Sequence, residues 1–257
     1  MSFEADSECV EAIQPAVNFG ERRGVQGPDI ILLHYTGMND GDGALKWLCG
    51  EESGVSCHYF VEEDGCVLQL VPEEKRAHHA GAGRWENSDD INSRSIGIEI
   101  VNAGHPGGLP DFPEQQMSAV AKLSGDIISR HGILPHHVLA HSDIAPGRKE
   151  DPGENFNWAY LATKSVGLWI EPTEISSGAF FQEGDVGQPV EALQSMLSLY
   201  GYGLEINGKF DHQTRIVIEA FQRHFRQEKV DGVADFSTID TLHRLLRLRQ
   251  IAGGENS

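Results

Sequence analysis

One stretch near the N-terminus decides the fold class, Asp29-Ile-Ile-Leu-Leu-His-Tyr35. A continuous apolar run of this length is too short for a helix and is typical of a buried β-strand. The stretch therefore predicts a strand in the core of the domain. It also places His34 at or near the end of that strand.

Further strands are predicted after this stretch. The runs His58 to Glu62 and Cys66 to Val71 flank Glu63-Asp64-Gly65, a turn signal, and together they predict a β-hairpin. The run Ser95 to Val101 predicts another strand, and Glu99 lies inside it.

A helix and a last strand follow. Between Pro113 and His131 apolar residues recur at spacings of three and four, and Gly132 supplies a stop signal, which predicts an amphipathic helix against the sheet. Val138 to His141 predicts a short strand that delivers His141 into a loop over residues 142–155. Strands mixed with helices predict an α/β domain, although the order of the elements alone does not fix its topology.

The composition changes at Glu171-Pro-Thr-Glu-Ile-Ser-Ser-Gly178, a polar stretch with Pro and Gly that predicts a domain boundary. Beyond it, a first helix is predicted over residues 190–200. The spacing Gly208 to Thr214 then recurs as Gly232 to Thr238, each time before an apolar helix. This pattern predicts a small all-α unit of three helices with an internal repeat, and by itself it would fit any helical adaptor.

Charge and composition exclude several kinds of partner. The formal net charge of −19 makes nucleic acid and anionic membrane poor partners, and no apolar run approaches the ~20 residues that span a bilayer. The four cysteines form no C-x-x-C pair, which predicts free thiols and not a thiolate metal site. The acidic N-terminus lacks a secretory signal, which predicts the cytoplasm, or the periplasm or cell envelope if a leader was removed.

The segment from His141 to Gly153 carries the residue types of a metal site. It is rich in Pro and Gly and can fold back so that His141 and Asp151 face one ion, with Lys149 beside it. The spacing alone does not decide the matter, because an isolated His in such a loop is more often a surface or capping residue. Equally, Glu99 could be a paired strand carboxylate and Lys149 a solvated loop residue.

Five motifs in order carry a resemblance to a known family. They are Leu32-Leu33-His34-Tyr35-Thr36, Val55-Ser56-Cys57-His58-Tyr59-Phe60, Ala77-His78-His79-Ala80-Gly81, Ser95-Ile96-Gly97-Ile98-Glu99-Ile100 and the loop from His141 to Gly153. Over about residues 25–165 the chain resembles the type-2 N-acetylmuramoyl-L-alanine amidases, the AmpD/AmiD group. The resemblance implies a mixed β-sheet flanked by helices. It also implies hydrolysis of the amide bond between N-acetylmuramic acid, or anhydro-muramic acid, and L-alanine in peptidoglycan or its fragments.

The resemblance further implies a zinc ion, with His34, His141 and Asp151 as its ligands. It implies Glu99 and Lys149 as the catalytic pair. Glu99 would take a proton from the attacking water and pass it to the alanine nitrogen, and Lys149 would stabilise the oxyanion.

One motif position separates branches of the family. Related phage and animal proteins often carry Tyr just before the second motif histidine, where this chain has Cys57. Glu99 therefore fits the bacterial branch, and His58 is expected to be structural.

Two residues are predicted to form walls of the substrate groove, His79 and Trp85, because a polar donor and an aromatic face suit a sugar–peptide junction. Between Trp85 and Asn92 the bacterial members carry basic residues, whereas this chain has acidic ones, Glu86, Asp89 and Asp90. The preferred stem peptide is left open by this departure.

The C-terminal repeat resembles the three-helix peptidoglycan-binding domain over about residues 180–248, through motifs such as Gly208-x-Phe210 and Phe221-Gln222. The predicted organisation is an N-terminal extension (1–24), a zinc amidase domain (25–170), a linker (171–179) and a peptidoglycan-binding domain (180–250). Every predicted ligand and catalytic group lies in residues 1–175, so we expect that fragment to fold and cut alone.

The sequence is compatible with two functions. The first is an amidase whose partners are peptidoglycan or muropeptides, and the alternative is a peptidoglycan recognition protein that binds without cutting. The complete ligand set favours the enzyme, because the loss of one ligand would disable zinc binding. The sequence leaves open the choice between intact wall and anhydromuropeptide, the oligomeric state, and whether the C-terminal unit binds glycan or packs on the groove.

Overall fold

The computed structural model describes residues 3–178 and 180–254. Its centre is a six-stranded sheet in the order β1-β5-β4-β7-β3-β8, in which β4 and β5 pair antiparallel and the other neighbours pair parallel. The strands are β1 (Ala12–Ile13), β3 (Ile30–Tyr35), β4 (Tyr59–Val61), β5 (Val67–Gln69), β7 (Ser95–Ile100) and β8 (Val138–Ala140). A second, two-stranded sheet pairs β2 (Phe19–Glu21) with β6 (Lys75–Ala77). The prediction of a mixed sheet is confirmed.

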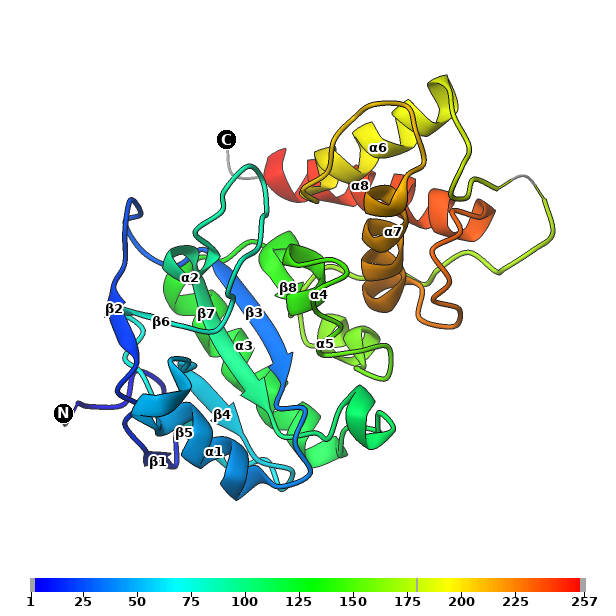
Figure 1. The fold of residues 1–257 in the computed structure, drawn as a ribbon. Helices are drawn as coiled ribbons and strands as arrows, with labels where there is room; N and C mark the ends of the chain where they lie inside the picture. Colours follow the sequence, from blue (N-terminus) through cyan, green and yellow to red (C-terminus); the bar gives the residue numbers. More distant parts are fainter. Residues whose placement is uncertain (1–2, 179, 255–257) are drawn as a thin grey trace.

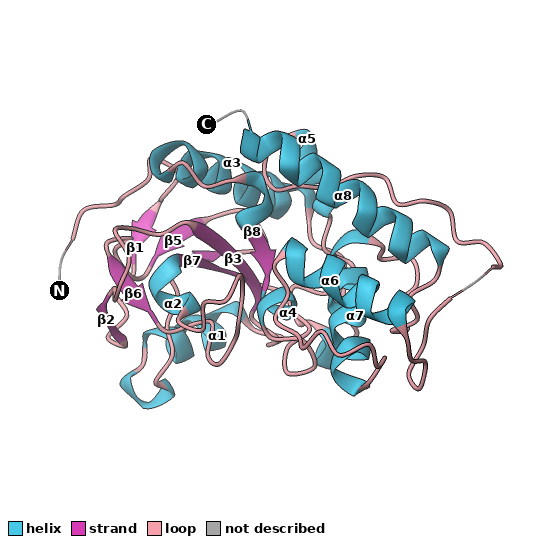
Figure 2. Cartoon of the chain, turned by 90° about the horizontal axis from the view of Figure 1, so that it is seen from above, coloured by secondary structure: helices cyan, strands magenta, loops and turns pink. Residues whose placement is uncertain are grey.

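Helices cover both faces of the large sheet (Figure 2). On one face lie α3 (Glu114–His131) and α5 (Trp158–Thr163); on the other lie α1 (Gly41–Cys49), α2 (Ile91–Arg94) and α4 (His141–Ile144). Short 3-10 helices occupy Glu51–Ser53, His105–Gly107 and Pro135–His137.

The central strand β3 is buried on both faces, as its apolar run predicts. Ile31 and Leu33 pack into the core under α3 and α5, while Ile30 and Leu32 belong to a second core on the opposite face. Because side chains alternate along a strand, His34 leaves the sheet on the same side as Ile30 and Leu32. The strand thus delivers a polar side chain to one face only.

Most predicted elements of this part of the chain are confirmed. The hairpin is β4 and β5, and the amphipathic helix is α3, which ends at Gly132 in the left-handed conformation (φ 67°). The loop after β8 begins with a short helix, α4, that was not predicted from the sequence. Helix α1 was not predicted either, since its first turn contains two glycines; Asp40 caps that turn through the Asp42 and Gly43 N–H groups.

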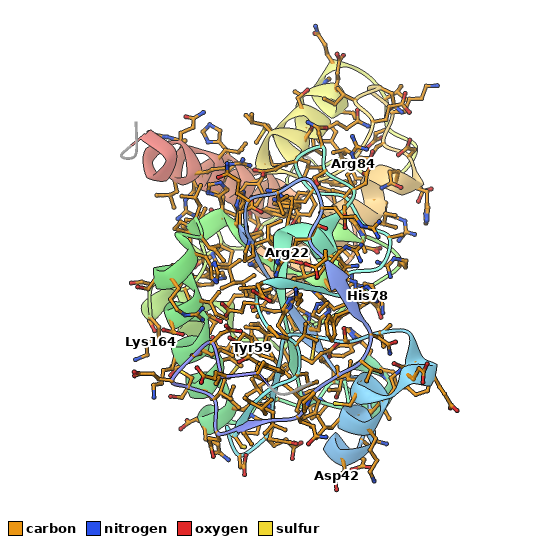
Figure 3. The ribbon with its side chains drawn as sticks, turned by 90° about the vertical axis from the view of Figure 1, so that its left-hand side faces the viewer. Arg22, Asp42, Tyr59, His78, Arg84 and Lys164 are labelled. Carbon is orange, nitrogen blue, oxygen red and sulfur yellow. The ribbon has the colours of Figure 1, made fainter. Side chains whose placement is uncertain are left out.

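One arginine ties the N-terminal segment to the sheet. Arg22, labelled in Figure 3, donates to the carbonyl oxygens of Ser93 and Ser95 at 2.9 and 3.0 Å, and its guanidinium also lies 3.2 Å from the His58 ring. His58 is fully buried and its Nδ1 accepts the Gly97 N–H at 2.9 Å. The prediction that His58 is structural is confirmed by these contacts.

The C-terminal region consists of α6 (Gln188–Tyr200), α7 (His212–Phe225) and α8 (Phe236–Gly254). Its internal repeat is visible in the hydrogen bonds. Gln194 accepts from the Gly208 N–H and donates to the Thr214 hydroxyl, and Gln222 does the same with Gly232 and Thr238. The predicted three-helix unit is therefore confirmed, each repeat being closed by a buried glutamine.

The three C-terminal helices pack directly on the first part of the chain, with α7 beside α4 (Figure 1). One of the apolar cores extends through both parts of the chain. Leu32 and Leu139 of the sheet belong to it together with Tyr202 and Phe221. The two regions are thus joined by burial and not only by the connecting segment.

Candidate active site

A cleft of about 680 Å³ opens at the carboxyl end of β3 and β7. Its floor contains His34 from β3 and Glu99 from β7, which are paired in the sheet register. Helix α1 forms one rim, and the loop after α4 forms the other, with Lys149 and Asp151. Proteins with α/β sheets commonly bind ligands at the carboxyl ends of their parallel strands.

Three side chains in the cleft bring one atom each to a common point. His34 Nδ1 lies 2.9 Å from His141 Nδ1 and 3.0 Å from Asp151 Oδ2, and His141 Nδ1 lies 2.9 Å from that same oxygen. All three residues are at least 95 % buried. The structure therefore brings together the three predicted ligands, from a strand, a helix start and a loop.

The outer nitrogens of the two histidines fix which ring atoms carry protons. His141 Nε2 lies 2.9 Å from the Ala80 carbonyl oxygen and must donate to it. His34 Nε2 lies 3.0 Å from His79 Nδ1; His79 Nε2 lies 3.2 Å from the Ser95 hydroxyl, whose proton goes to the Ile91 carbonyl. His79 therefore donates to Ser95 and accepts from His34.

It follows that both Nδ1 atoms present lone pairs toward the Asp151 carboxylate. Burial, and then the neighbouring His141, lower the pKa of His34 to about 4, so this ring has no second proton at neutral pH. Three acceptors about 3 Å apart repel one another unless a cation lies between them.

Zinc suits this set of donors. Two imidazole nitrogens and a carboxylate oxygen form a known catalytic ligand set, and N and O ligands about 2.0–2.1 Å from a tetrahedral zinc lie roughly 3.3 Å apart. The observed separations of 2.9–3.0 Å are close to that spacing. Outward hydrogen bonds from ligand histidines are also usual at such sites.

Glu99 lies beside this cluster on the cleft floor. Its Oε2 is buried and has no hydrogen-bond partner among the described residues. Burial, and then the charge of Asp151, raise the pKa of Glu99 well above its usual value, while Lys149 opposes the shift. A buried carboxyl group with a raised pKa at the floor of a cleft has the properties of a general acid or base.

The loop after α4 is closed by its own backbone. The Ser142 N–H donates to the Asp151 carbonyl at 3.1 Å, which brings the two ends of the segment together. The Lys149 N–H donates to the Ala145 carbonyl at 3.0 Å, and the half-buried Lys149 side chain lies on the rim of the cleft.

The two residues predicted as groove walls have different positions. His79 borders the cleft, but it is only 8 % exposed and its ring stands behind His34. It packs so closely on Gly97 that a Cβ there would lie 2.4 Å from His79 Nδ1. In this position His79 is better placed to hold the His34 ring than to contact a substrate.

Trp85 does not reach the cleft. It is completely buried and packs edge-on against Tyr200 and Tyr202, with ring centroids 6.1 and 5.1 Å away. The expectation of a groove wall does not agree with this position, because a fully buried ring cannot touch a ligand. The residues that bury Trp85 lie more than a hundred positions away in the chain, and the pattern around Trp85 does not indicate them.

The acidic residues after Trp85 also lie outside the cleft and are paired with arginines. Asp89 binds Arg84 at 3.1 Å and Asp90 binds Arg76 at 2.8 Å. Glu86 binds Arg94 and Arg249 and lies 3.0 Å from His137. A histidine–glutamate cluster of Glu86, His136 and His137 resembles a metal site in outline, but both carboxylate oxygens already accept from guanidinium groups.

Comparison with known proteins identifies the family. The sequence model of the N-acetylmuramoyl-L-alanine amidases matches residues 24–154, and that of a peptidoglycan binding domain matches residues 186–242. The amidase AmiD of Escherichia coli is 35 % identical over 224 residues, which cover 81 % of this chain and 79 % of AmiD. The chain belongs to the N-acetylmuramoyl-L-alanine amidase family.

Solved structures of relatives agree with this amidase over both regions. E. coli AmiD, in complex with the substrate anhydro-N-acetylmuramic acid-L-Ala-D-γ-Glu-L-Lys, superimposes with a TM-score of 0.74 at 33 % identity and covers 90 % of this chain and 98 % of its own. AmpDh3 of Pseudomonas aeruginosa, in complex with anhydromuramic pentapeptide, gives 0.72 at 28 % identity, with coverage of 97 % and 99 %. The predictions of fold, of enzyme class and of the family are confirmed. Within residues 3–178 and 180–254, no helix of the amidase has the length and apolarity that a membrane span requires.

One feature of the site was not predicted from the sequence. The rim formed by α1 carries Trp47, which is 54 % exposed, next to Met38 and Val55. An exposed tryptophan beside a cleft is not distinguishable by sequence from a helix residue that packs inward, and α1 itself was not predicted.

Proposed function

We propose that this amidase holds one zinc ion on His34, His141 and Asp151 and hydrolyses the amide bond between the muramic acid lactyl group and L-alanine. The observation that carries the proposal is the meeting of three buried lone pairs at separations of 2.9–3.0 Å, with both outer ring protons donated elsewhere. Zinc supplies Lewis acidity to such a hydrolysis when it is bound.

Glu99 and Lys149 complete the chemistry. Glu99, with its buried Oε2 that lacks a partner among the described residues, takes a proton from the attacking water and returns it to the alanine nitrogen as the C–N bond breaks. Lys149 lies on the rim formed by the loop after α4. It places a positive charge near the oxygen that becomes negative in the tetrahedral intermediate.

His79 has a supporting role in this proposal. Its Nδ1 accepts the His34 Nε2–H, and its own proton goes to Ser95. This arrangement holds the His34 ring with Nδ1 toward the ion and increases the basicity of the ligand.

The substrate class follows from the relatives and from the cleft. The solved complexes contain anhydromuramic peptides, and we propose such muropeptides, together with peptidoglycan, for this amidase. The apolar rim of Met38, Trp47 and Val55 offers a face for the sugar ring or the lactyl group. The matched peptidoglycan binding region, 186–242, would hold the enzyme on the polymer and raise its local concentration near further bonds.

Metal analysis tests the ligand set. The purified amidase should contain about one zinc per chain, and Asp151→Asn should lose most of it, because a neutral amide binds zinc weakly. Asp111→Asn, a matched change outside the cluster, should keep the metal. Wild-type protein that binds no zinc, or an Asp151→Asn variant that binds it normally, would overturn the assignment.

A further inference from the structure

The loop that carries His141, Lys149 and Asp151 has two sides. One side faces the cleft, and the other lies against the C-terminal helices, chiefly α7. The packing is close: a Cβ on Gly147 would come within 2.8 Å of Ile216 in α7. The loop is therefore held between substrate space and the C-terminal region.

At the start of the loop, contact is made through Asp143, two residues after His141. The Asp143 carboxylate is fully buried and accepts the Ala140 N–H at 2.8 Å, immediately before the ligand. It also accepts the Tyr202 hydroxyl at 2.6 Å, and it lies 2.7 Å from His224 Nδ1. Both of these side-chain partners come from the C-terminal region.

At the end of the loop, a second set of contacts reaches the neighbours of Asp151. Arg223 binds Glu150, the residue between Lys149 and Asp151, at 3.1 Å. Gln227 donates to the carbonyl oxygens of Glu154 and Phe156 at 2.6 and 2.8 Å. Side chains of the C-terminal region therefore bond to the loop at Asp143, two residues after His141, and at Glu150, next to Asp151.

We infer that the C-terminal helical region is a structural part of the metal centre, with Tyr202 and Arg223 as positioning residues that act on His141 and Asp151. A buried carboxylate such as Asp143 needs its partners, and their removal leaves it free to shift with the backbone before His141. This inference rests on the proposed zinc site. It argues against the expectation that residues 1–175 fold and cut alone, because that fragment lacks Tyr202, Arg223, His224 and Gln227.

The full-length protein offers matched variants for a test. Tyr202→Phe removes only the hydroxyl group that donates a hydrogen bond to Asp143. Tyr200→Phe makes the same change on a stacked ring whose centroid is 6.1 Å away, and this ring has no bond to the loop among the described residues. Arg223→Gln removes the ion pair to Glu150, whereas Arg215→Gln, on the same helix, removes ion pairs to Glu183 and Glu219. Each test variant and its control thus make the same chemical change, but only the test variant removes a contact to the loop.

The measurements are the zinc dissociation constant, by competition with a chelating dye, and turnover of a soluble anhydromuropeptide. Tyr202→Phe with Arg223→Gln should weaken zinc binding about tenfold, the lower range for outer partners of a metal site, and excess zinc should restore part of the turnover. The control pair should stay within about twofold of wild type. Circular dichroism verifies folding, and the single variants carry the comparison if the double variant unfolds.

A folded double variant with wild-type zinc affinity and turnover would overturn the inference, since the amidase region alone would then hold the loop. Wild-type protein without zinc affinity would instead overturn the proposed metal site. The two failures are therefore distinguishable.

Discussion

His34 and Glu99 stand opposite each other on neighbouring parallel strands, and both side chains leave the sheet on the same face. The isoleucines on either side of Glu99, Ile98 and Ile100, point into the opposite core. The sheet register therefore sets a proposed ligand and a proposed general base side by side without help from any loop. Rigid elements of this kind hold catalytic geometry better than loops do.

The catalytic pair gives the first prediction. Glu99→Gln should bind zinc normally yet lower kcat by roughly 10²-fold or more, because an amide cannot relay the proton. Lys149→Met should also act mainly on kcat, by loss of the positive charge near the oxyanion. Steady-state kinetics on a soluble muropeptide, with metal content measured in parallel, check both.

A carboxylate outside the cleft supplies the control for that experiment. Glu74→Gln alters an exposed residue whose ion pair is with Lys75 and should leave kcat unchanged. Near-normal rates in both Glu99→Gln and Lys149→Met would transfer the proposed roles to other residues.

His79 gives the second prediction. His79→Ala removes the acceptor for the His34 Nε2–H, so zinc affinity should fall about 10- to 100-fold. His78→Ala is the neighbouring control, since His78 (Figure 3) makes no hydrogen bond to His34 in the part of the chain that the structure describes. An unchanged zinc dissociation constant in His79→Ala would show that the His34 ring does not depend on this bond.

Trp47 gives the third prediction. Trp47→Ala should raise KM for anhydromuropeptides about tenfold, the equivalent of ~1.4 kcal/mol of lost binding, with kcat within twofold. Of the other three tryptophans, Trp85 and Trp158 are buried and Trp169 does not line the cleft, so a change in tryptophan fluorescence on substrate binding should disappear with Trp47. Leu199→Ala, an exposed apolar residue outside the cleft, is the control. An unaltered KM and fluorescence response would exclude the apolar rim from the binding site.

Glu73 gives the fourth prediction, on stability in acid. Burial alone would raise its pKa, but hydrogen bonds from Arg130, His131 and Tyr59 outweigh burial and lower the pKa to about 2 from 4.5. A lowered carboxyl pKa stabilises the fold above the unfolded-state pKa, and this contribution disappears as pH falls from about 4.5 to 2. Glu73→Gln should therefore cost on the order of 3 kcal/mol at pH 7, and the difference from wild type should shrink in that acid window.

Denaturant unfolding at a series of pH values measures this difference. The exposed neighbour Glu74 forms a surface ion pair with Lys75, so Glu74→Gln should change the free energy of unfolding by less than about 1 kcal/mol at any pH. A Glu73→Gln penalty that stays constant down to pH 2 would contradict the assigned pKa shift.

Local sequence features predicted the parts of this structure that depend on local physics. The apolar run before His34 determined β3, and the spacing of apolar residues determined α3. The five motifs then named the cluster of His34, His141 and Asp151, which the structure brings together. Strand period and helix period are readable from neighbours in the chain.

The positions of Trp85 and Asp143 were not predictable in the same way. Trp85 is buried by Tyr200 and Tyr202, and Asp143 is bonded to Tyr202 and His224, all of which come from the far end of the chain. No periodicity in residues 80–145 indicates such partners. The same distance in sequence explains why the C-terminal region was expected to be an independent module.

The central claim is that zinc on His34, His141 and Asp151 enables this amidase to cut the muramoyl–L-alanine bond. Its most direct test incubates zinc-loaded, zinc-stripped and zinc-restored enzyme with anhydro-N-acetylmuramic acid-L-Ala-D-γ-Glu-L-Lys and identifies the products by mass. We predict free anhydro-N-acetylmuramic acid and a peptide that begins with L-alanine from the loaded and restored enzyme, and intact substrate from the stripped enzyme. Cleavage at another bond, no cleavage by the loaded enzyme, or full cleavage without zinc would contradict the account.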